Sequence, residues 1–348
     1  MHTDRRALRH CSLRPHFYLN RTGRRTTMIK YSLFAFATVA TAAAWAVLVF
    51  FAASEGWGRE PLTSEETPEA FLQSARRMIE SENVGNVGLA VIEQGKVVGH
   101  AYASVGEPIN GSSLFQVASL SKWLTAWGVM VLVEEGLIDL DTPVSTYLSR
   151  GRLPDSSFDN DGVTVRRLLS HTSGLDDALG YAGFDSREDV ESLEASLTQA
   201  SDASPGRSGV VRVGREPGSG WAYSGGGYTL LQLLIEEVSD QSFTAFMKAK
   251  VFSPLGLHRT TFDHAAAEEM GLAENYSLDG AAEALRWYTA VGAASLFTTM
   301  DDLAAFLSAQ APQSDQSVLS DSTLKLMRTS HATQMGVDTW GLGVILYT

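Results

Sequence analysis

The chain has 348 residues, of which 44% are hydrophobic and 19% are charged, a composition that allows a sizeable packed core and argues against wholesale disorder. Its only cysteine, Cys11, cannot build a disulfide framework, a CxxC redox pair or a thiolate zinc site. Residues 1–30 hold eight bases and one acid, which leaves 19 bases against 39 acids, or about −20, on the remainder. An acidic body argues against nucleic acid as a partner.

Residues 31–53 (YSLFAFATVATAAAWAVLVFFAA) carry no charge. A helix of this length spans roughly 34 Å, against about 30 Å of bilayer hydrocarbon. Bases before it, and Glu55 and Glu60 after it, orient the N-terminus inside the cell. We therefore expect a basic cytoplasmic tail (1–30), a single-pass anchor in the cytoplasmic membrane (31–53), a linker (54–63) and a periplasmic or extracellular domain (64–348).

Other interpretations of this N-terminal segment stay open. A signal peptide could be cleaved near Ala52 and Ala53, although the apolar run is longer than an ordinary signal sequence needs. A buried core helix is a third interpretation. Met28 could be the true start, because Met-Ile-Lys already supplies a positive charge before the apolar run.

The remaining elements are predicted from hydrophobic spacing and helix caps. Ser64 is expected to cap a helix over 64–83, and the turn EQGK to join two strands within 86–104. A longer helix should begin at Ser119 and end at Gly136. Further helices are expected over 227–239, 242–252 and 298–310, and strands at 209–213 and 340–348.

Together these elements predict an α+β fold, with an antiparallel sheet built from both ends of the domain, flanked by helices, and a helical region inserted. Trp123 and Trp127 are expected in the core. The acidic stretch 176–204 should be a solvated loop that could rim a substrate cleft.

The stretch QVASLSKWLTA contains Ser119, Ser121 and Lys122. If Ser119 opens a helix, Lys122 lies one turn later on the same face, where its amine could activate the hydroxyl. The spacing alone is weak, because Ser322 and Lys325 repeat it. A second stretch, WAYSGGGYTLL, places Tyr223 before three glycines, and a phenol can act as an acid or base if a nearby cation lowers its pKa.

Six stretches in this order resemble the serine β-lactamase and penicillin-binding-protein-like hydrolases, most closely the class C β-lactamase, DD-peptidase and family VIII esterase branch. The resemblance runs over about residues 85–345, and the six stretches read LFQVASLSKWLTA, LVEEGLIDLDTPVSTYL, VTVRRLLSHTSGL, EPGSGWAYSGGGYTLLQLLIEEVS, FSPLGLHRTTF and AASLFTTMDDLAAFL.

The resemblance implies a β-lactamase/transpeptidase-like fold and assigns roles. Ser119 would be the acylated nucleophile, and its backbone N–H one oxyanion donor. Lys122 would be its activating partner, and Tyr223 the proton shuttle of the family's Y-x-N motif. Lys122 and Tyr223 would titrate as a coupled pair. Ser121 has no role in the motif. The substrate would be an ester, an amide, a D-amino-acid peptide or a β-lactam, including peptidoglycan-like molecules.

Two departures from the family pattern matter. Gly225 stands where the Y-x-N motif has its asparagine, so we expect this substrate-binding position to lack an amide, and Trp221 to line the site. The third family motif, K-T-G or H-x-G, is absent. In the family it follows the stretch resembling WGLGVILYT, so we expect it, with the last strands and a helix, beyond Thr348. A non-catalytic, membrane-tethered binding module is the alternative.

His171 with Asp176 or Asp177 could suggest a Ser–His–Asp triad. The chain lacks a G-x-S-x-G elbow, and the resemblance places LLSHTSGL in a structural turn, so we expect His171 to be structural. No HExxH or other dense ligand cluster is present. We therefore expect no metal and no cofactor.

Overall fold

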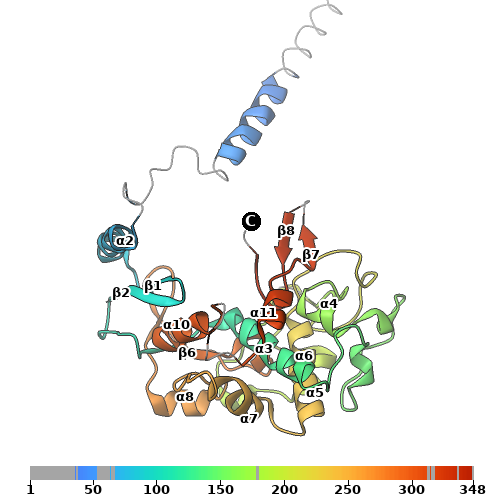
Figure 1. Cartoon of the computed structure of the whole chain (residues 1–348). Coiled ribbons are helices and arrows are strands. Elements are labelled where there is room, and N and C mark those ends of the chain that lie inside the picture. The colour runs from blue at the N-terminus through green and yellow to red at the C-terminus, as the bar shows by residue number, and fades with distance from the viewer. Residues whose placement is uncertain are drawn as a thin grey trace, which may run out of the picture. The chain divides into compact units, whose positions relative to one another are not determined.

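The computed structural model (Figure 1) describes residues 36, 38–52, 63, 67–177, 180–311, 314, 318–334 and 337–346. The chain forms two compact units, residues 1–62 and residues 63–348. Each unit is described by itself.

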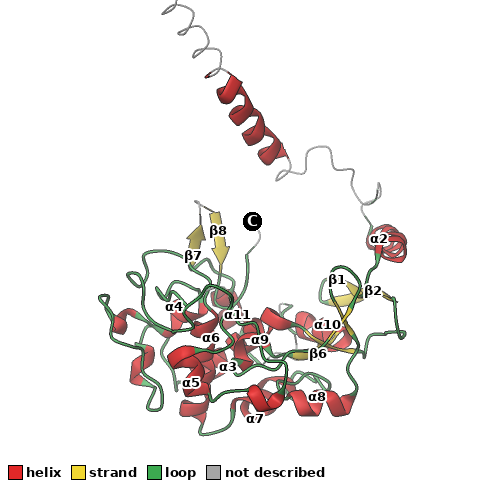
Figure 2. Cartoon of the chain, turned by 180° about the vertical axis from the view of Figure 1, so that it is seen from behind, coloured by secondary structure: helices red, strands yellow, loops and turns green. Residues whose placement is uncertain are grey.

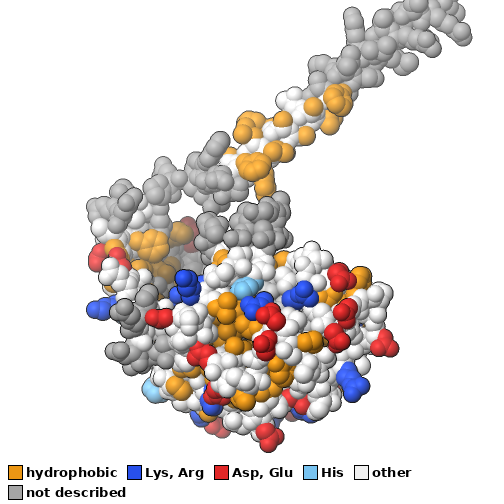
Figure 3. Space-filling view, turned by 45° about the vertical axis from the view of Figure 1, so that its right-hand side comes forward, with side chains coloured by type: hydrophobic (Ala, Val, Ile, Leu, Met, Phe, Trp, Pro, Cys, Tyr) orange, Lys and Arg blue, Asp and Glu red, His pale blue; other side chains and the backbone are white. Residues whose placement is uncertain are grey.

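In the first unit, residues 38–52 are helical, and Figure 3 shows this helix covered with apolar side chains. In the described ranges of the chain, no helix is both long and apolar enough to cross a membrane. Residues 31–35, 37 and 53 of the predicted anchor lie outside those ranges, as do the tail 1–30 and most of the linker 54–63. The predicted anchor is thus not supported by the described residues, and the outward location stays a prediction.

The second unit is an α+β domain. Its helices are α2 (Pro68–Glu82), α3 (Ser121–Glu134), α4 (Val165–Leu169), α5 (Leu193–Gln199), α6 (Gly225–Ser239), α7 (Phe243–Met247), the π-helix η5 (Lys248–Phe252), α8 (His264–Met270), α9 (Val291–Ala294), α10 (Met300–Ser308) and α11 (Asp321–Met327). Short 3₁₀ turns are η1 (Ala118–Leu120), η2 (Val144–Thr146), η3 (Asn160–Gly162) and η4 (Arg187–Asp189).

The strands pair two by two, all antiparallel. They are β1 (Asn86–Glu93) with β2 (Lys96–Ser104), β3 (Leu114–Gln116) with β6 (Phe297–Thr299), β4 (Asn275–Tyr276) with β5 (Ala282–Glu283), and β7 (Ala332–Gln334) with β8 (Val337–Trp340).

Helices α3 and α6 form the centre of the domain, and the β1–β2 hairpin lies to one side between α2 and α10 (Figures 1 and 2). Helix α3 is apolar on nearly every face, as a helix buried among others must be. Trp127 is fully buried and Trp123 half-buried, which confirms both as core residues. Their rings contact Phe306 of α10, with centroids 4.9 and 5.0 Å away.

Local signals set most helix boundaries. The long helix from the Ser119 region is confirmed: α3 begins at Ser121, two residues late, and Gly136 adopts the positive φ of 71° that glycine permits after a helix end. The predicted cap at Ser64 is wrong. Thr67 caps α2 by accepting from the Ala70 N–H at 3.2 Å, and Pro68 suits the first helical position because it needs no N–H partner there.

The β1–β2 hairpin confirms two strands around EQGK. One larger sheet from both ends of the domain is not found among the described residues, because β3–β6 forms a separate pair. The strand predicted at 340–348 is also wrong. Strand β8 ends at Trp340, since the chain turns at Gly343 (φ 78°) and the Gly341 N–H bonds the Val344 carbonyl at 2.8 Å. In the stretch 209–213, only Val213 makes a β-bridge, to Leu175.

The packing of α10 against α3 predicts a stability effect. Phe306→Ala removes a fully buried ring between the two tryptophans, and should lower the free energy of unfolding by about 3–5 kcal/mol. Urea unfolding followed by tryptophan fluorescence measures this. Leu278→Ala is the control, because this side chain is 97% exposed and its loss should change stability by less than about 0.5 kcal/mol. Equal stability of the two variants would contradict the packing described.

Candidate active site

Ser119 lies in the 3₁₀ turn η1 that joins strand β3 to helix α3, and it is exposed. The residue before it, Ala118, has a φ of +44°, a left-handed conformation that a residue with a Cβ seldom adopts. Ser121 stabilises this turn, because its hydroxyl donates to the Ala118 carbonyl and accepts the Leu296 N–H at 2.9 Å. Ser121 therefore shapes the turn that presents Ser119.

Lys122 lies one turn further along and points back to Ser119. Its Nζ is 3.3 Å from the Ser119 Oγ and donates to the Ala293 carbonyl at 2.7 Å. The side chain is buried, in contrast to the exposed serine. The structure thus brings the predicted pair together. The matching pair Ser322 and Lys325 on α11 is exposed at both positions.

Burial changes the chemistry of Lys122. Removal of the ammonium from water lowers the pKa of Lys122 to about 7, although the negative charge of Asp177 opposes the shift. The Nζ also lies 4.9 Å from the centroid of the Tyr223 ring. Above this pKa the Lys122 amine is mostly neutral, and the lone pair of a neutral Nζ can accept the Ser119 hydroxyl proton.

Tyr223 joins the same group. Burial raises the pKa of Tyr223, and its hydrogen bond with Ser119 lowers it by less, so the phenol stays protonated at neutral pH. A nearby cation does not turn it into a phenolate base. Of the pair expected to titrate together, only Lys122 has a pKa low enough to accept a proton near pH 7, while Tyr223 keeps its proton there and can donate it.

Trp221 lies beside Tyr223, with ring centroids 6.3 Å apart. The ring of Trp340 lies near both, with its centroid 5.8 Å from that of Trp221 and 6.0 Å from that of Tyr223. Trp340 belongs to the predicted strand 340–348, and its position beside Tyr223 was not predicted from the sequence. The predicted substrate contact of Trp221 stays a prediction.

Gly225 is buried at the first position of α6, and Tyr181 occupies the space beside it. A Cβ at position 225 would lie 2.9 Å from the Tyr181 Cε2, closer than real Cβ atoms approach. The Tyr181 hydroxyl bonds Thr229 at 3.0 Å, which fixes the ring there. Position 225 thus has no side-chain amide, as predicted, and the ring of Tyr181, from the stretch 176–204, fills the space where a side chain would lie.

His171 and Asp177 do not form a triad with Ser119. The His171 Nδ1 accepts the Ser224 N–H at 3.2 Å, so it cannot donate to a carboxylate. Asp177 accepts from the Ser224 hydroxyl at 2.5 Å and the Gly226 N–H at 2.6 Å. Asp177 thus fixes the start of α6, a role that its sequence position did not reveal.

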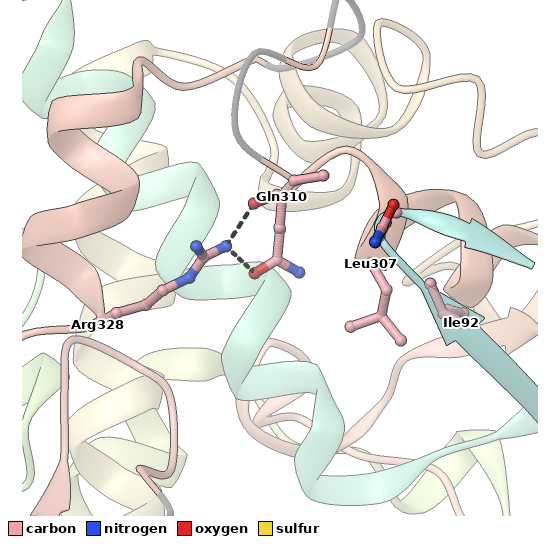
Figure 4. A pocket seen from close by; sticks show the side chains of 7 residues that line it. Ile92, Leu307, Gln310 and Arg328 are labelled. Carbon is pink, nitrogen blue, oxygen red and sulfur yellow. Dashed lines mark hydrogen bonds between the residues drawn. The ribbon is translucent and has the colours of Figure 1, made fainter. Parts of the chain in front are cut away.

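A pocket at another place, of about 580 Å³, is bordered by the β1–β2 turn and the ends of α10 and α11 (Figure 4). Arg328 donates there to the Gln310 carbonyl and Oε1, at 2.8 and 3.3 Å, beside Ile92 and Leu307. It contains none of the predicted site residues. Within the described residues, no group of three or more His, Cys, Asp or Glu side chains is placed to hold a metal ion.

The site consists of an exposed serine beside a buried lysine and a tyrosine, at the start of a central helix. This arrangement defines the class of α+β proteins with a Ser-x-x-Lys centre. The Beta-lactamase family model matches residues 71–348. The chain therefore belongs to the Beta-lactamase family, whose members are serine hydrolases, and the resemblance found in its motifs is confirmed.

Known proteins agree with this assignment. A penicillin-binding protein of Bacillus subtilis (strain 168) is 34% identical over 203 residues, 56% of this chain and 42% of that protein. The octameric penicillin-binding protein homologue from Pyrococcus abyssi superposes with a TM-score of 0.65 at 26% identity, covering 81% of this chain and 65% of that one. The D-amino acid amidase from Ochrobactrum anthropi SV3 shares the fold, with a TM-score of 0.63 at 23% identity and 80% coverage of both chains. The chain spans about two fifths of the length of the curated relatives it matches.

The lowered pKa of Lys122 predicts a pH dependence. The rate of acylation by a fixed ester should rise with pH and reach half its plateau near pH 7, because only the neutral amine accepts the Ser119 proton. Lys122→Arg should lower the rate by about 10²–10⁴-fold at every pH tested, since a guanidinium stays charged. Stopped-flow acylation kinetics measure both. A rate independent of pH between about pH 6 and pH 9 would contradict Lys122 as the base.

Proposed function

We propose that the protein is a serine hydrolase that works through an acyl-enzyme on Ser119. The observation that carries this proposal is the 3.3 Å contact between the Ser119 Oγ and the buried Lys122 Nζ. An exposed hydroxyl beside an amine with a pKa of about 7 is an activated nucleophile at neutral pH. Membership of the Beta-lactamase family supports the same chemistry.

The groups of the site suggest each proton's path. The Ser119 Oγ attacks the acyl carbon while its proton passes to the Lys122 Nζ. The bond to the leaving group then breaks, and the leaving atom takes a proton from the Tyr223 phenol, which the Lys122 ammonium restores. Water next attacks the acyl carbon and gives one proton to Lys122; the bond to the Ser119 Oγ then breaks, the acid leaves, and the Lys122 ammonium returns that proton to the Ser119 Oγ. The site returns to its starting state.

The proposed substrate is a small acyl donor: an ester, an amide, a D-amino-acid peptide or a β-lactam. The amidase of the same fold and the penicillin-binding relative agree with this range. Gly225 offers no side-chain amide to hold a substrate carbonyl, and Tyr181 fills the neighbouring space. This combination favours esters within the range.

The same observation at Gly225 favours a second candidate, a non-catalytic binding module of this fold. Such a module would bind the acyl compound without forming a bond to Ser119. The contact between Ser119 and Lys122 argues against it, because binding alone does not need a buried amine whose pKa is lowered to about 7.

Labelling with a fluorophosphonate distinguishes the two candidates. The full chain should gain one covalent label, located on Ser119 by peptide mass spectrometry, and Ser119→Ala should lose it. Ser322→Ala is the matched control, because Ser322 has the same spacing to a lysine but is exposed together with it, and this variant should label as the parent does. Absence of a label on the folded full chain would contradict the hydrolase and support the binding module.

A further inference from the structure

We propose that His171 is a positioning residue, which holds the Tyr223 ring in place for proton transfer at Ser119. The proposal rests on the proposed function, because the proton that Tyr223 moves belongs to the acyl transfer.

His171 binds the main chain on both sides of Tyr223. The Ala222 N–H donates to the His171 carbonyl at 2.8 Å, and the Ser224 N–H donates to the His171 Nδ1 at 3.2 Å. Between these two bonds, the imidazole lies against the phenol ring, with centroids 4.5 Å apart and planes inclined by 32°. One residue thus fixes the tyrosine through its backbone and through its ring.

His171 itself has little freedom. It is 1% exposed and adopts a φ of +57°, a left-handed conformation that costs energy for most residues with a Cβ. Its ring also lies 5.2 Å from Tyr228 and 4.8 Å from Trp340, centroid to centroid. Such a packed residue can hold its neighbour to a fraction of an ångström, which proton transfer requires.

His171 remains neutral, so it supports the site by its shape and not by its charge. Burial lowers the pKa of His171 well below its usual value, and the nearby Lys122 lowers it further. Since Nδ1 accepts a hydrogen bond, the ring proton sits on Nε2, which has no hydrogen-bond partner among the residues that the structure describes. A neutral ring beside Lys122 adds no charge that would disturb the lysine.

The test removes the ring and keeps the other features of His171. Asparagine tolerates a left-handed φ and offers an oxygen to the Ser224 N–H, so His171→Asn should fold. Its acylation rate should fall about 10–100-fold, because Tyr223 loses its support, while KM changes much less. The pH midpoint should stay near 7, because Lys122 remains buried.

A double-mutant cycle shows whether His171 acts through Tyr223. In the Tyr223→Phe background, His171→Asn should lower the rate by less than about 2-fold. An equal loss in both backgrounds, or a pH midpoint that moves toward 10, would overturn the proposal and indicate general loosening. His264→Asn is the control: His264 is also a buried histidine stacked on an aromatic ring, Trp287 at 3.6 Å, and its loss should leave the rate and the midpoint unchanged.

A second measurement does not depend on catalysis. With 3-fluorotyrosine in the protein, the ¹⁹F resonance of Tyr223 should be single and sharp in the parent and in His264→Asn, and should shift or broaden in His171→Asn. An unchanged resonance would overturn the positioning role. If the parent is never acylated, the proposed function fails, and this resonance still decides whether His171 holds Tyr223.

Discussion

The site depends on the burial of one amine. Lys122 lies in the interior of the domain, where its Nζ reaches the Ala293 carbonyl and the exposed hydroxyl of Ser119. Water would keep this amine charged near pH 7, and a charged amine cannot take a proton from serine. The packing that excludes water therefore lowers the pKa of Lys122, and the nearby negative charge of Asp177 limits how far it falls.

Strands and aromatic rings from distant parts of the chain surround Lys122 and the turn that contains Ser119. Strand β3 (Leu114–Gln116) lies directly before the turn that contains Ser119. It pairs with β6 (Phe297–Thr299), which is far away in the sequence. The aromatic rings of Tyr223 and Tyr228 cover the lysine, with centroids 4.9 and 5.7 Å from the Nζ. Ser119, Lys122 and Tyr223 thus lie together, and each contact among them depends on segments that are distant in the sequence.

The sequence predicts those parts of the site whose geometry is local. A spacing of three residues places Ser119 and Lys122 on one helical face, the hydrophobic pattern identifies α3 and α6, and glycine marks the end of α3. Contacts between distant segments could not be predicted in this way. Tyr181 beside Gly225, Asp177 at the start of α6 and Trp340 beside Tyr223 each depend on how the loops fold back. Residues 340–348 were predicted as a strand because they are largely apolar, but the chain turns at Gly343, which has a positive φ.

NMR titration of the Lys122 side chain tests the central claim most directly. The chain has six lysines, so labelling the lysine ε-carbons with ¹³C gives few signals, and Lys122→Met identifies the one that matters. We predict that this signal titrates with a midpoint near pH 7, well separated from the other five. A midpoint near 10.4, the ordinary value for lysine in water, would contradict the account, because Lys122 would then be charged wherever the protein is expected to work.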